Sequence, residues 1–250
     1  MSEPPTPPRP DGEGTGTDVA GPGLPPPSWR PAEALPVFLV AVGVSVVAGV
    51  ALASLGCALQ TVVTSLVGEL AFALAVVGWV RFVSRGSLAA LGRPRRPGGD
   101  LGVGAVAGLG LVALAYGVLA AVSVAVRAVT GSPPPQPEQV AGCVRGEALA
   151  LFAPVVILLA PLGEELYFRG FLYRGLRRRY GTWPSALVSG ALFGVVHFGG
   201  LAFLLIIPSL VLVGVGLALL FEWRRSILAP MAAHAVFNAL GYLAIVLGRT

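Results

Sequence analysis

Long apolar runs alternate along this chain with short polar segments that contain arginine. A helix needs about 20 apolar residues to cross roughly 30 Å of hydrocarbon, and several runs reach that length with almost no charge. They lack the polar stripe of period 3.6 that a soluble amphipathic helix carries. The pattern therefore predicts an all-α fold, a polytopic membrane helix bundle of about seven transmembrane helices. The predicted helices cover residues 35–58, 61–83, 101–127, 148–172, 184–199, 201–221 and 227–247.

The polar connections differ in arginine content, and this difference predicts the orientation. All 17 basic residues are arginine, because the chain contains no lysine. Residues 84–99, 173–182 and 222–226 hold four, four and two arginines, whereas the connections that alternate with them hold only Arg145. Basic connections stay in the cytoplasm, so we expect a cytoplasmic N-terminus and an external C-terminus. The net charge of +5 thus reflects membrane topology, and no nucleic-acid partner is expected.

The first 33 residues differ in composition from the rest of the chain. They contain 10 Pro and 5 Gly with few large apolar side chains, which predicts a disordered tail over residues 1–33. Residues 34–250 form the predicted transmembrane domain. The whole chain is 55% hydrophobic and only 12% charged, with a mean hydropathy of +0.82. Its abundance of Ala, Gly, Val, Pro and Arg is typical of GC-rich genomes, so we expect a multi-pass protein of a bacterial plasma membrane.

Both cysteines, Cys57 and Cys143, fall on the external side in this topology. An oxidising exterior permits a disulfide there. A disulfide also needs Cα atoms less than about 7 Å apart, which the sequence does not show. Two free thiols are therefore the expected state.

Two adjacent glutamates and an arginine interrupt the apolar run at "GEELYFRG". A charge in hydrocarbon costs a few kcal/mol or more, so such residues usually face a wet cavity. Glu164 and Glu165 point about 100° apart on a helix, and Arg169 lies one turn after Glu165. We therefore expect a structural Glu165–Arg169 pair, which leaves Glu164 to face a cavity. Pro161, with Gly163, is expected to bend the helix just before the glutamates.

The chain has only two histidines and one asparagine, and all three lie in apolar runs. His197, His234, Asn238 and Glu164 all lie roughly 10–20 Å from the cytoplasmic boundary at about 1.5 Å per residue. Any one of them alone is explained by a hydrogen bond between helices. Together, at matching depth, they predict one polar site. Glu69, in the second predicted helix, is expected to be a structural carboxyl nearer the external side.

Three ordered motifs carry a family resemblance over about residues 148–247. "EELYFR", which begins at Glu164, fits EExxxR; "FGVVH", from Phe193, fits FxxxH; "HAVFN", from His234, fits HxxxN. This region resembles the CPBP family of intramembrane proteases, which is the CAAX protease and bacteriocin-processing family, also called Abi. The resemblance implies a protease core at residues 148–247, and membrane lipids and a peptide or membrane-protein substrate as partners.

The resemblance also implies a role for each motif residue. Glu164 and His197 would activate a water for peptide hydrolysis, while His234 and Asn238 would stabilise the oxyanion. The supporting motif positions are Glu165, Arg169 and Phe193. The chemistry agrees, because peptide hydrolysis needs a base beside the water and hydrogen-bond donors at the developing oxyanion.

Two questions stay open at the level of the sequence. The first is the cofactor: either none is required, or Glu164, His197 and His234 hold one divalent metal such as zinc, with Glu165 as the base. We favour the metal-free reading, in which each residue has one task. The second is the class of protein, because a catalytically inactive membrane scaffold, a bacteriocin immunity protein or a proton-coupled transporter are alternatives to an endopeptidase. A bacterial origin argues against prenylated CAAX substrates, since bacteria generally lack prenyl transferases.

Overall fold

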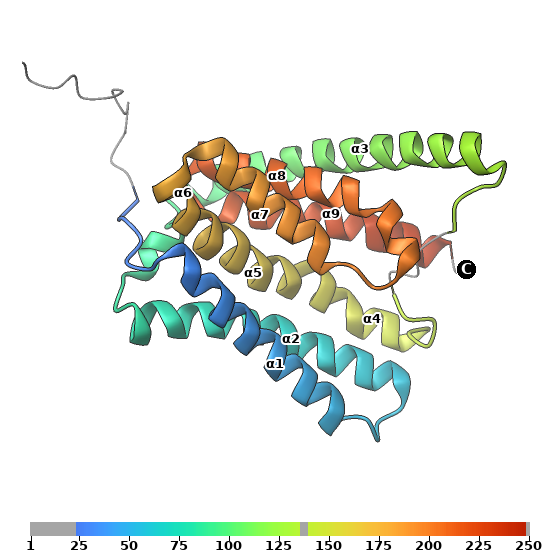
Figure 1. The fold of residues 1–250 in the computed structure, drawn as a ribbon. Helices are drawn as coiled ribbons and strands as arrows, with labels where there is room; N and C mark the ends of the chain where they lie inside the picture. Colours follow the sequence, from blue (N-terminus) through green and yellow to red (C-terminus); the bar gives the residue numbers. More distant parts are fainter. Residues whose placement is uncertain (1–23, 136–139, 249–250) are drawn as a thin grey trace, which may run out of the picture.

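The computed structural model describes residues 24–135 and 140–248, and every regular element in that part of the chain is helical (Figure 1). The α-helices are α1 (Ala34–Ala51), α2 (Cys57–Gly78), α3 (Pro97–Thr130), α4 (Glu147–Pro154), α5 (Ala160–Glu165), α6 (Arg174–Tyr180), α7 (Thr182–Val196), α8 (Ile207–Arg224) and α9 (Leu228–Leu247). Short 3-10 helices are η1 (Pro31–Glu33), η3 (Leu88–Leu91) and η6 (Leu201–Leu205). The π-helical segments are η2 (Trp79–Val83), η4 (Val155–Leu159) and η5 (Leu166–Tyr173).

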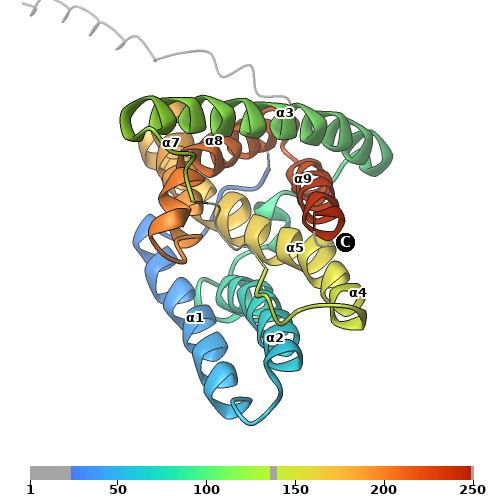
Figure 2. The same cartoon turned by 90° about the vertical axis from the view of Figure 1, so that its right-hand side faces the viewer.

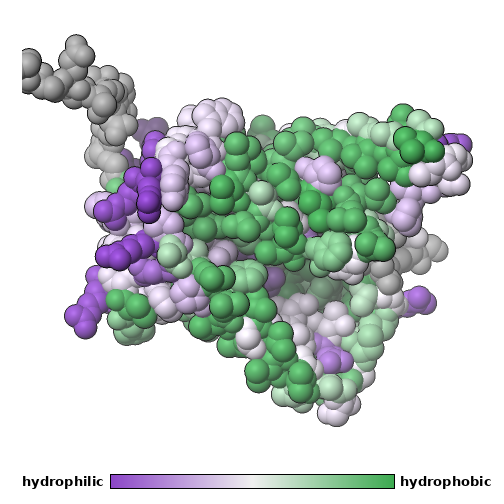
Figure 3. All heavy atoms as spheres, viewed as in Figure 1, coloured by the Kyte–Doolittle hydropathy of each residue, from purple (hydrophilic) through white to green (hydrophobic). Residues whose placement is uncertain are grey.

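Six helical stretches are long and apolar enough to cross a membrane, which confirms the predicted polytopic bundle. They are Pro31–Ala51, Cys57–Val83, Pro97–Thr130, Glu147–Tyr180, Ile207–Arg224 and Leu228–Leu247. The remaining predicted helix, 184–199, forms as α7. It has 15 residues and is shorter than the six candidate spans. The surface agrees with a membrane protein: Figure 3 shows polar residues gathered at the end that carries α6, and apolar residues over the middle of the same face.

The helices pack as a hairpin, a central helical run and an outer group (Figures 1 and 2). The hairpin of α1 and α2 lies on one side, and the run from α4 to η5 passes through the middle. On the opposite side α3 lies across α8 and α9. The contact between α3 and α9 is close because Gly104 and Gly108 have no side chain: a Cβ there would collide with the carbonyl oxygens of Ala229 and Ala233.

The central run, residues 147–180, is not a regular α-helix. It contains η4 before α5 and η5 after it, so Glu164 and Glu165 lie between two π-helical segments. Such segments often mark functional sites. The bend predicted at Pro161 stays a prediction; the structure shows a change of helical register just before α5. Gly163 lets α2 approach closely, because a Cβ there would stand 2.6 Å from the Glu69 carbonyl oxygen.

Residues 24–33 pack against the bundle, which corrects the predicted extent of the disordered tail. Trp29 is only 1% exposed and stacks on Phe171 with ring centroids 4.8 Å apart. Its indole Nε1 donates a 2.9 Å hydrogen bond to the Phe171 carbonyl oxygen. The guanidinium of Arg178 donates to the Pro27 carbonyl oxygen over 2.7 Å. Composition alone missed this, because one buried tryptophan and a few backbone acceptors hold the segment. The rest of the predicted tail, residues 1–23, lies outside the described residues.

The expectation of two free thiols is wrong. Cys57 and Cys143 form a disulfide with Cα atoms 6.1 Å apart. Cys57 begins α2, while Cys143 precedes α4 in a segment held by an apolar cluster that includes Val62 and Val144. Tertiary packing therefore brings the two sulfurs together near the starts of α2 and α4, and these helix starts lie at the end of the bundle opposite α6 (Figure 1). The disulfide therefore anchors the segment before α4 to the start of α2.

Candidate active site

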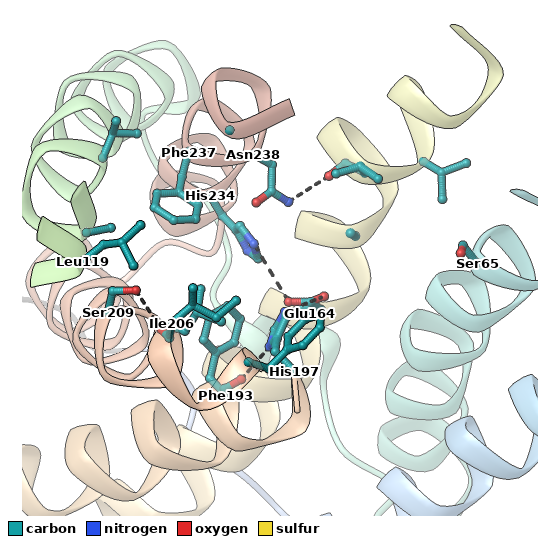
Figure 4. Close-up of a pocket in the computed structure, with 18 of the residues that line it drawn as sticks. Ser65, Leu119, Glu164, Phe193, His197, Ile206, Ser209, His234, Phe237 and Asn238 are labelled. Carbon is teal, nitrogen blue, oxygen red and sulfur yellow. Dashed lines mark hydrogen bonds and ion pairs between the residues drawn. The ribbon is translucent and has the colours of Figure 1, made fainter. Parts of the chain in front are cut away.

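One cavity of about 500 Å³ collects the polar residues that the sequence singled out. Glu164, His197, His234 and Asn238 all line it, and they come from α5, the end of α7 and α9. Figure 4 shows the two imidazoles approaching Glu164 from different sides, with α2 and its Ser65 beyond. The structure therefore brings the four predicted site residues together.

Glu164 faces both histidines without a direct hydrogen bond. Its Oε1 lies 4.0 Å from His197 Nε2, and its Oε2 lies 3.9 Å from His234 Nε2. Hydrogen bonds between nitrogen and oxygen are shorter, at about 2.7–3.2 Å. The carboxylate and the two ring nitrogens thus surround a gap of the size that one bridging water needs.

His197 has a fixed orientation. Its Nδ1 lies 2.7 Å from the Phe193 carbonyl oxygen, one turn earlier in α7. A carbonyl oxygen only accepts, so Nδ1 carries the proton and donates it. In the neutral ring Nε2 is then an acceptor, and it is this atom that points toward Glu164. This leaves a proton acceptor on each side of the gap.

Glu165 holds two partners instead of the single one that its spacing predicts. Its Oε1 accepts from Arg169 Nη1 over 2.7 Å, which confirms the expected pair. The same oxygen lies 2.9 Å from His234 Nδ1, a contact that the sequence did not predict. Both Glu165 and Arg169 are fully buried. Glu165 therefore orients His234 so that its Nε2 points toward Glu164, as carboxylates often orient functional imidazoles.

Phe193 explains physically why an aromatic residue precedes His197 by one turn. Its ring is 1% exposed and lies beside Arg169, His197 and His234. Its centroid is 4.5 Å from the Arg169 guanidinium carbon, 4.9 Å from the His197 ring and 5.5 Å from the His234 ring. The ring face attracts the cation, and its bulk fixes both imidazoles.

The Asn238 side chain donates a hydrogen bond to a backbone carbonyl oxygen of the π-helical segment η4. Its Nδ2 donates a 2.8 Å hydrogen bond to the Val156 carbonyl oxygen in η4 (Figure 4). The Ala160 N–H donates to the Val155 carbonyl oxygen, five residues earlier. In the same register, the carbonyl oxygen of Val156 would accept from the backbone N–H of residue 161, which is a proline. Proline has no N–H, and the Asn238 amide takes its place. The oxyanion role of Asn238 stays a prediction, and this bond gives its amide a structural task as well.

Glu69 lines the cavity, although its sequence position predicted only a structural carboxyl group. It lines the same cavity as Glu164, and its Oε2 is buried without a hydrogen-bond partner among the described residues. A signal was present, because Glu69 is the one charged residue of the apolar helix α2. The cost argument that singled out Glu164 applies equally to it. The missing information was that α2 packs against α5.

The polar residues as placed do not fit a metal ion. Within the described ranges, no group of three or more His, Cys, Asp or Glu side chains is arranged to hold one. Tetrahedral zinc, with ligands about 2.0–2.1 Å from the metal, sets neighbouring ligand atoms about 3.3 Å apart. The 3.9 and 4.0 Å separations at Glu164 are wider than that. We therefore derive no step through a metal.

Comparison with known proteins agrees with the motifs. Residues 146–240, which are less than half of the chain, match the family model described as type II CAAX prenyl endopeptidase Rce1-like. The uncharacterized protein YpbD of Bacillus subtilis (strain 168) is 30% identical over 83 residues, which is 33% of this chain and 40% of that relative. The match thus spans well under two thirds of the relative's length. No solved structure matches the chain. Over residues 146–240 the chain is therefore Rce1-like, and the family that its motifs predicted is confirmed for that segment.

Proposed function

We propose that this protein is an intramembrane endopeptidase of the CAAX prenyl protease type, which hydrolyses a peptide bond with an activated water. One observation carries the proposal: Glu164 faces two histidine Nε2 atoms, at 4.0 and 3.9 Å, in a cavity inside an apolar bundle. The Rce1-like match over residues 146–240 supports the same reaction class.

In the proposed first step, a water lies in the gap between Glu164 and His197. Both the carboxylate and the His197 Nε2 accept hydrogen bonds from it. Glu164 takes one proton, and the hydroxide oxygen attacks the carbonyl carbon of the scissile peptide bond. Glu164 suits this transfer because its carboxylate lines the cavity and is not engaged in an ion pair with an arginine in the described part of the chain.

The tetrahedral oxyanion needs donors that are already in place. His234 is suited to this, because its Nδ1 is bonded to Glu165 and its Nε2 points into the cavity. In its protonated form, Nε2 donates to the oxyanion, and the buried Glu165 compensates the imidazolium charge. The second N–H of the Asn238 amide is the other proposed donor. Preorganised donors of this kind each contribute about 10²–10³ in turnover.

The two ends of the bundle support the predicted orientation. Arg177, Arg178 and Arg179 lie in α6 at one end, and the Cys57–Cys143 disulfide lies at the other. Arginine clusters stay in the cytoplasm, and disulfides persist in oxidising compartments. We therefore propose a cytoplasmic N-terminus, a bacterial plasma membrane as the location, and a peptide or membrane-protein substrate as the partner beside the lipids.

A cleavage assay tests the proposal. Purified protein in lipid vesicles is incubated with membrane-peptide libraries, and the products are identified by mass spectrometry. We expect cleavage by the wild type and by Glu147→Gln, whose carboxylate is exposed at the start of α4, but not by Glu164→Gln. Cleavage that persists in Glu164→Gln would contradict the mechanism. A wild type that cleaves no peptide would instead favour the inactive scaffold or immunity protein.

A further inference from the structure

The carboxyl group of Glu69 lies against the helix that carries Glu164. A Cβ built on Gly163 would stand 3.0 Å from Glu69 Oε2, and Gly163 directly precedes Glu164. Both carboxyl groups line the same cavity. Glu69 lies outside residues 146–240, so neither the family match nor the motifs assign it a role.

Neither of these two carboxyl groups forms an ion pair with an arginine among the described residues. The described residues that line the cavity include neither arginine nor lysine. The nearby guanidinium of Arg169 is already bonded, with Nη1 on Glu165 and Nη2 3.0 Å from the Gly214 carbonyl oxygen. Its hydrogen bonds therefore go to Glu165 and Gly214, while its charge also acts on Glu164.

The other elements packed against α2 leave Glu164 as the charge that Glu69 faces. The charged or titratable residues on these elements are Glu164 and Glu165 on α5, Tyr167, Arg169 and Tyr173 on η5, Glu147 on α4 and Arg81 on η2; α1 and η4 have none. Glu147 and Arg81 are exposed. The Tyr167 and Tyr173 hydroxyls donate to the Ala34 carbonyl and to Glu222.

Two carboxylates that face one cavity of low dielectric repel each other, and a proton held by one of them removes that repulsion. The negative charge belongs on the member nearer to a positive group. Glu164 Oε2 lies 3.9 Å from His234 Nε2, which the proposed oxyanion step uses in its protonated form, and the Arg169 charge also acts on Glu164. Within the described residues neither group is paired with Glu69, whose Oε2 is buried against Gly163. Glu69 is therefore the member that holds the proton.

We propose that Glu69 is the general acid of the reaction, which rests on the endopeptidase function proposed above. Glu164 takes a proton from the water, and the new C–O bond forms. The Glu69 O–H then gives its proton to the peptide nitrogen as the C–N bond breaks, which releases a neutral amine. Glu164 is left protonated and Glu69 ionised. Transfer of that proton from Glu164 to Glu69 through a cavity water restores the starting state, so protons and electrons balance.

The first arm of the test reads the proton directly and needs no substrate. Infrared spectra of the whole protein in lipid at neutral pH report a protonated carboxyl group by its C=O stretch. We expect this band in the wild type and in the control Glu147→Gln, and its loss in Glu69→Gln. A band that is unchanged in Glu69→Gln would overturn the assignment of the proton.

The second arm uses two substrates that differ in their leaving group. Glu69→Gln keeps the shape of the side chain but has no acidic proton, so peptide turnover should fall about 10²-fold or more with little change in KM. The matching nitrophenyl ester needs no proton on its leaving group, and its turnover should stay within about threefold of the wild type. Glu164→Gln should lose both activities, because water activation serves both.

The outcomes separate the two proposals. Equal losses on peptide and ester in Glu69→Gln would mean a structural role and would overturn the acid role alone. Wild-type peptide turnover in Glu69→Gln would do the same. A wild type that cleaves neither substrate would overturn the endopeptidase function and, with it, the acid role, while the infrared band still decides where the proton lies.

Discussion

Glu164 and Glu165 are neighbours in the chain, yet they occupy opposite environments. The first lines the cavity, and its Oε2 has no hydrogen-bond partner among the residues that the structure describes. The second is fully buried and bonded through one oxygen to Arg169 and His234. The comparison teaches that a rotation of about 100° on a helix separates a reactive carboxylate from one that positions other groups.

The surrounding helix explains why the two faces stay distinct. Five residues of π-helix precede α5, and eight follow it. These segments rotate α5 relative to a regular helix, and the packing of Phe193 against Arg169 fixes the buried face. Substitutions that act on one face only are therefore the way to test the comparison.

The largest effect is expected on activity, at the cavity face. Glu164→Gln keeps the shape of the side chain but removes the proton acceptor, so peptide turnover should fall by about 10²–10⁴-fold. The melting temperature in lipid or detergent should stay within error of the wild type, because no hydrogen bond is lost. Peptide cleavage and thermal unfolding of the same preparations measure both. A folded, active Glu164→Gln would move the catalytic role to another residue.

The next largest effect is expected on stability, at the buried face. Glu165→Gln leaves Arg169 as an uncompensated buried charge, which typically costs about 3–5 kcal/mol. Replacing Arg169 too, as Glu165→Gln with Arg169→Met, should recover part of that loss, because removing both partners is gentler than removing one. Melting temperatures of the single and double variants measure the recovery.

Activity should not recover with stability in that double variant. His234 Nδ1 loses its carboxylate partner in both proteins, so its Nε2 is no longer held toward Glu164. We expect turnover well below the wild type even at a temperature where the double variant is fully folded. Full activity there would show that Glu165 serves stability alone.

Asn238 combines the two kinds of environment, because it lines the cavity and its amide also donates a hydrogen bond to the Val156 carbonyl oxygen. Asn238→Ala leaves the Val156 carbonyl without its donor, at a cost of about 1–3 kcal/mol. Pro161→Ala restores the backbone N–H that could donate to this carbonyl oxygen in the π-helical register. The cost of Asn238→Ala should therefore be smaller in the Pro161→Ala background. A double-mutant cycle of unfolding free energies measures it, and equal costs in both backgrounds would refute the explanation.

The smallest effect is expected for a carboxylate that belongs to neither face. Glu147 is exposed at the start of α4. Glu147→Gln should change stability by no more than about 0.5 kcal/mol and leave turnover unchanged. A larger loss in either measurement would mean that the effects at Glu164 and Glu165 are not specific to their surroundings.

Local spacing was enough to predict one part of the site. The i to i+4 distance predicted the Glu165–Arg169 pair, and the shared depth of His197 and His234 predicted their convergence on Glu164. These inferences succeed because helix geometry is regular over one turn. The six long apolar helices follow from the same kind of local information.

The rest depends on how helices pack, which no short spacing encodes. Glu69 joined the cavity because Gly163 allows α2 to approach α5. The bond of Asn238 depends on where the π-helical register begins, and the Cys57–Cys143 disulfide joins segments 86 residues apart. Each is a tertiary contact between elements that are each predictable by themselves.

The burial of Trp29 implies an order of events during synthesis. Its partner Phe171 follows 142 residues later in the chain. At about 5–20 residues per second, the ribosome needs about 7–28 s to add that stretch, and the indole has no stacking partner until then. The segment at residues 24–33 therefore docks only after the central helical run has been made. In this protein the first described residues cannot reach their final places before Phe171 has been added to the chain.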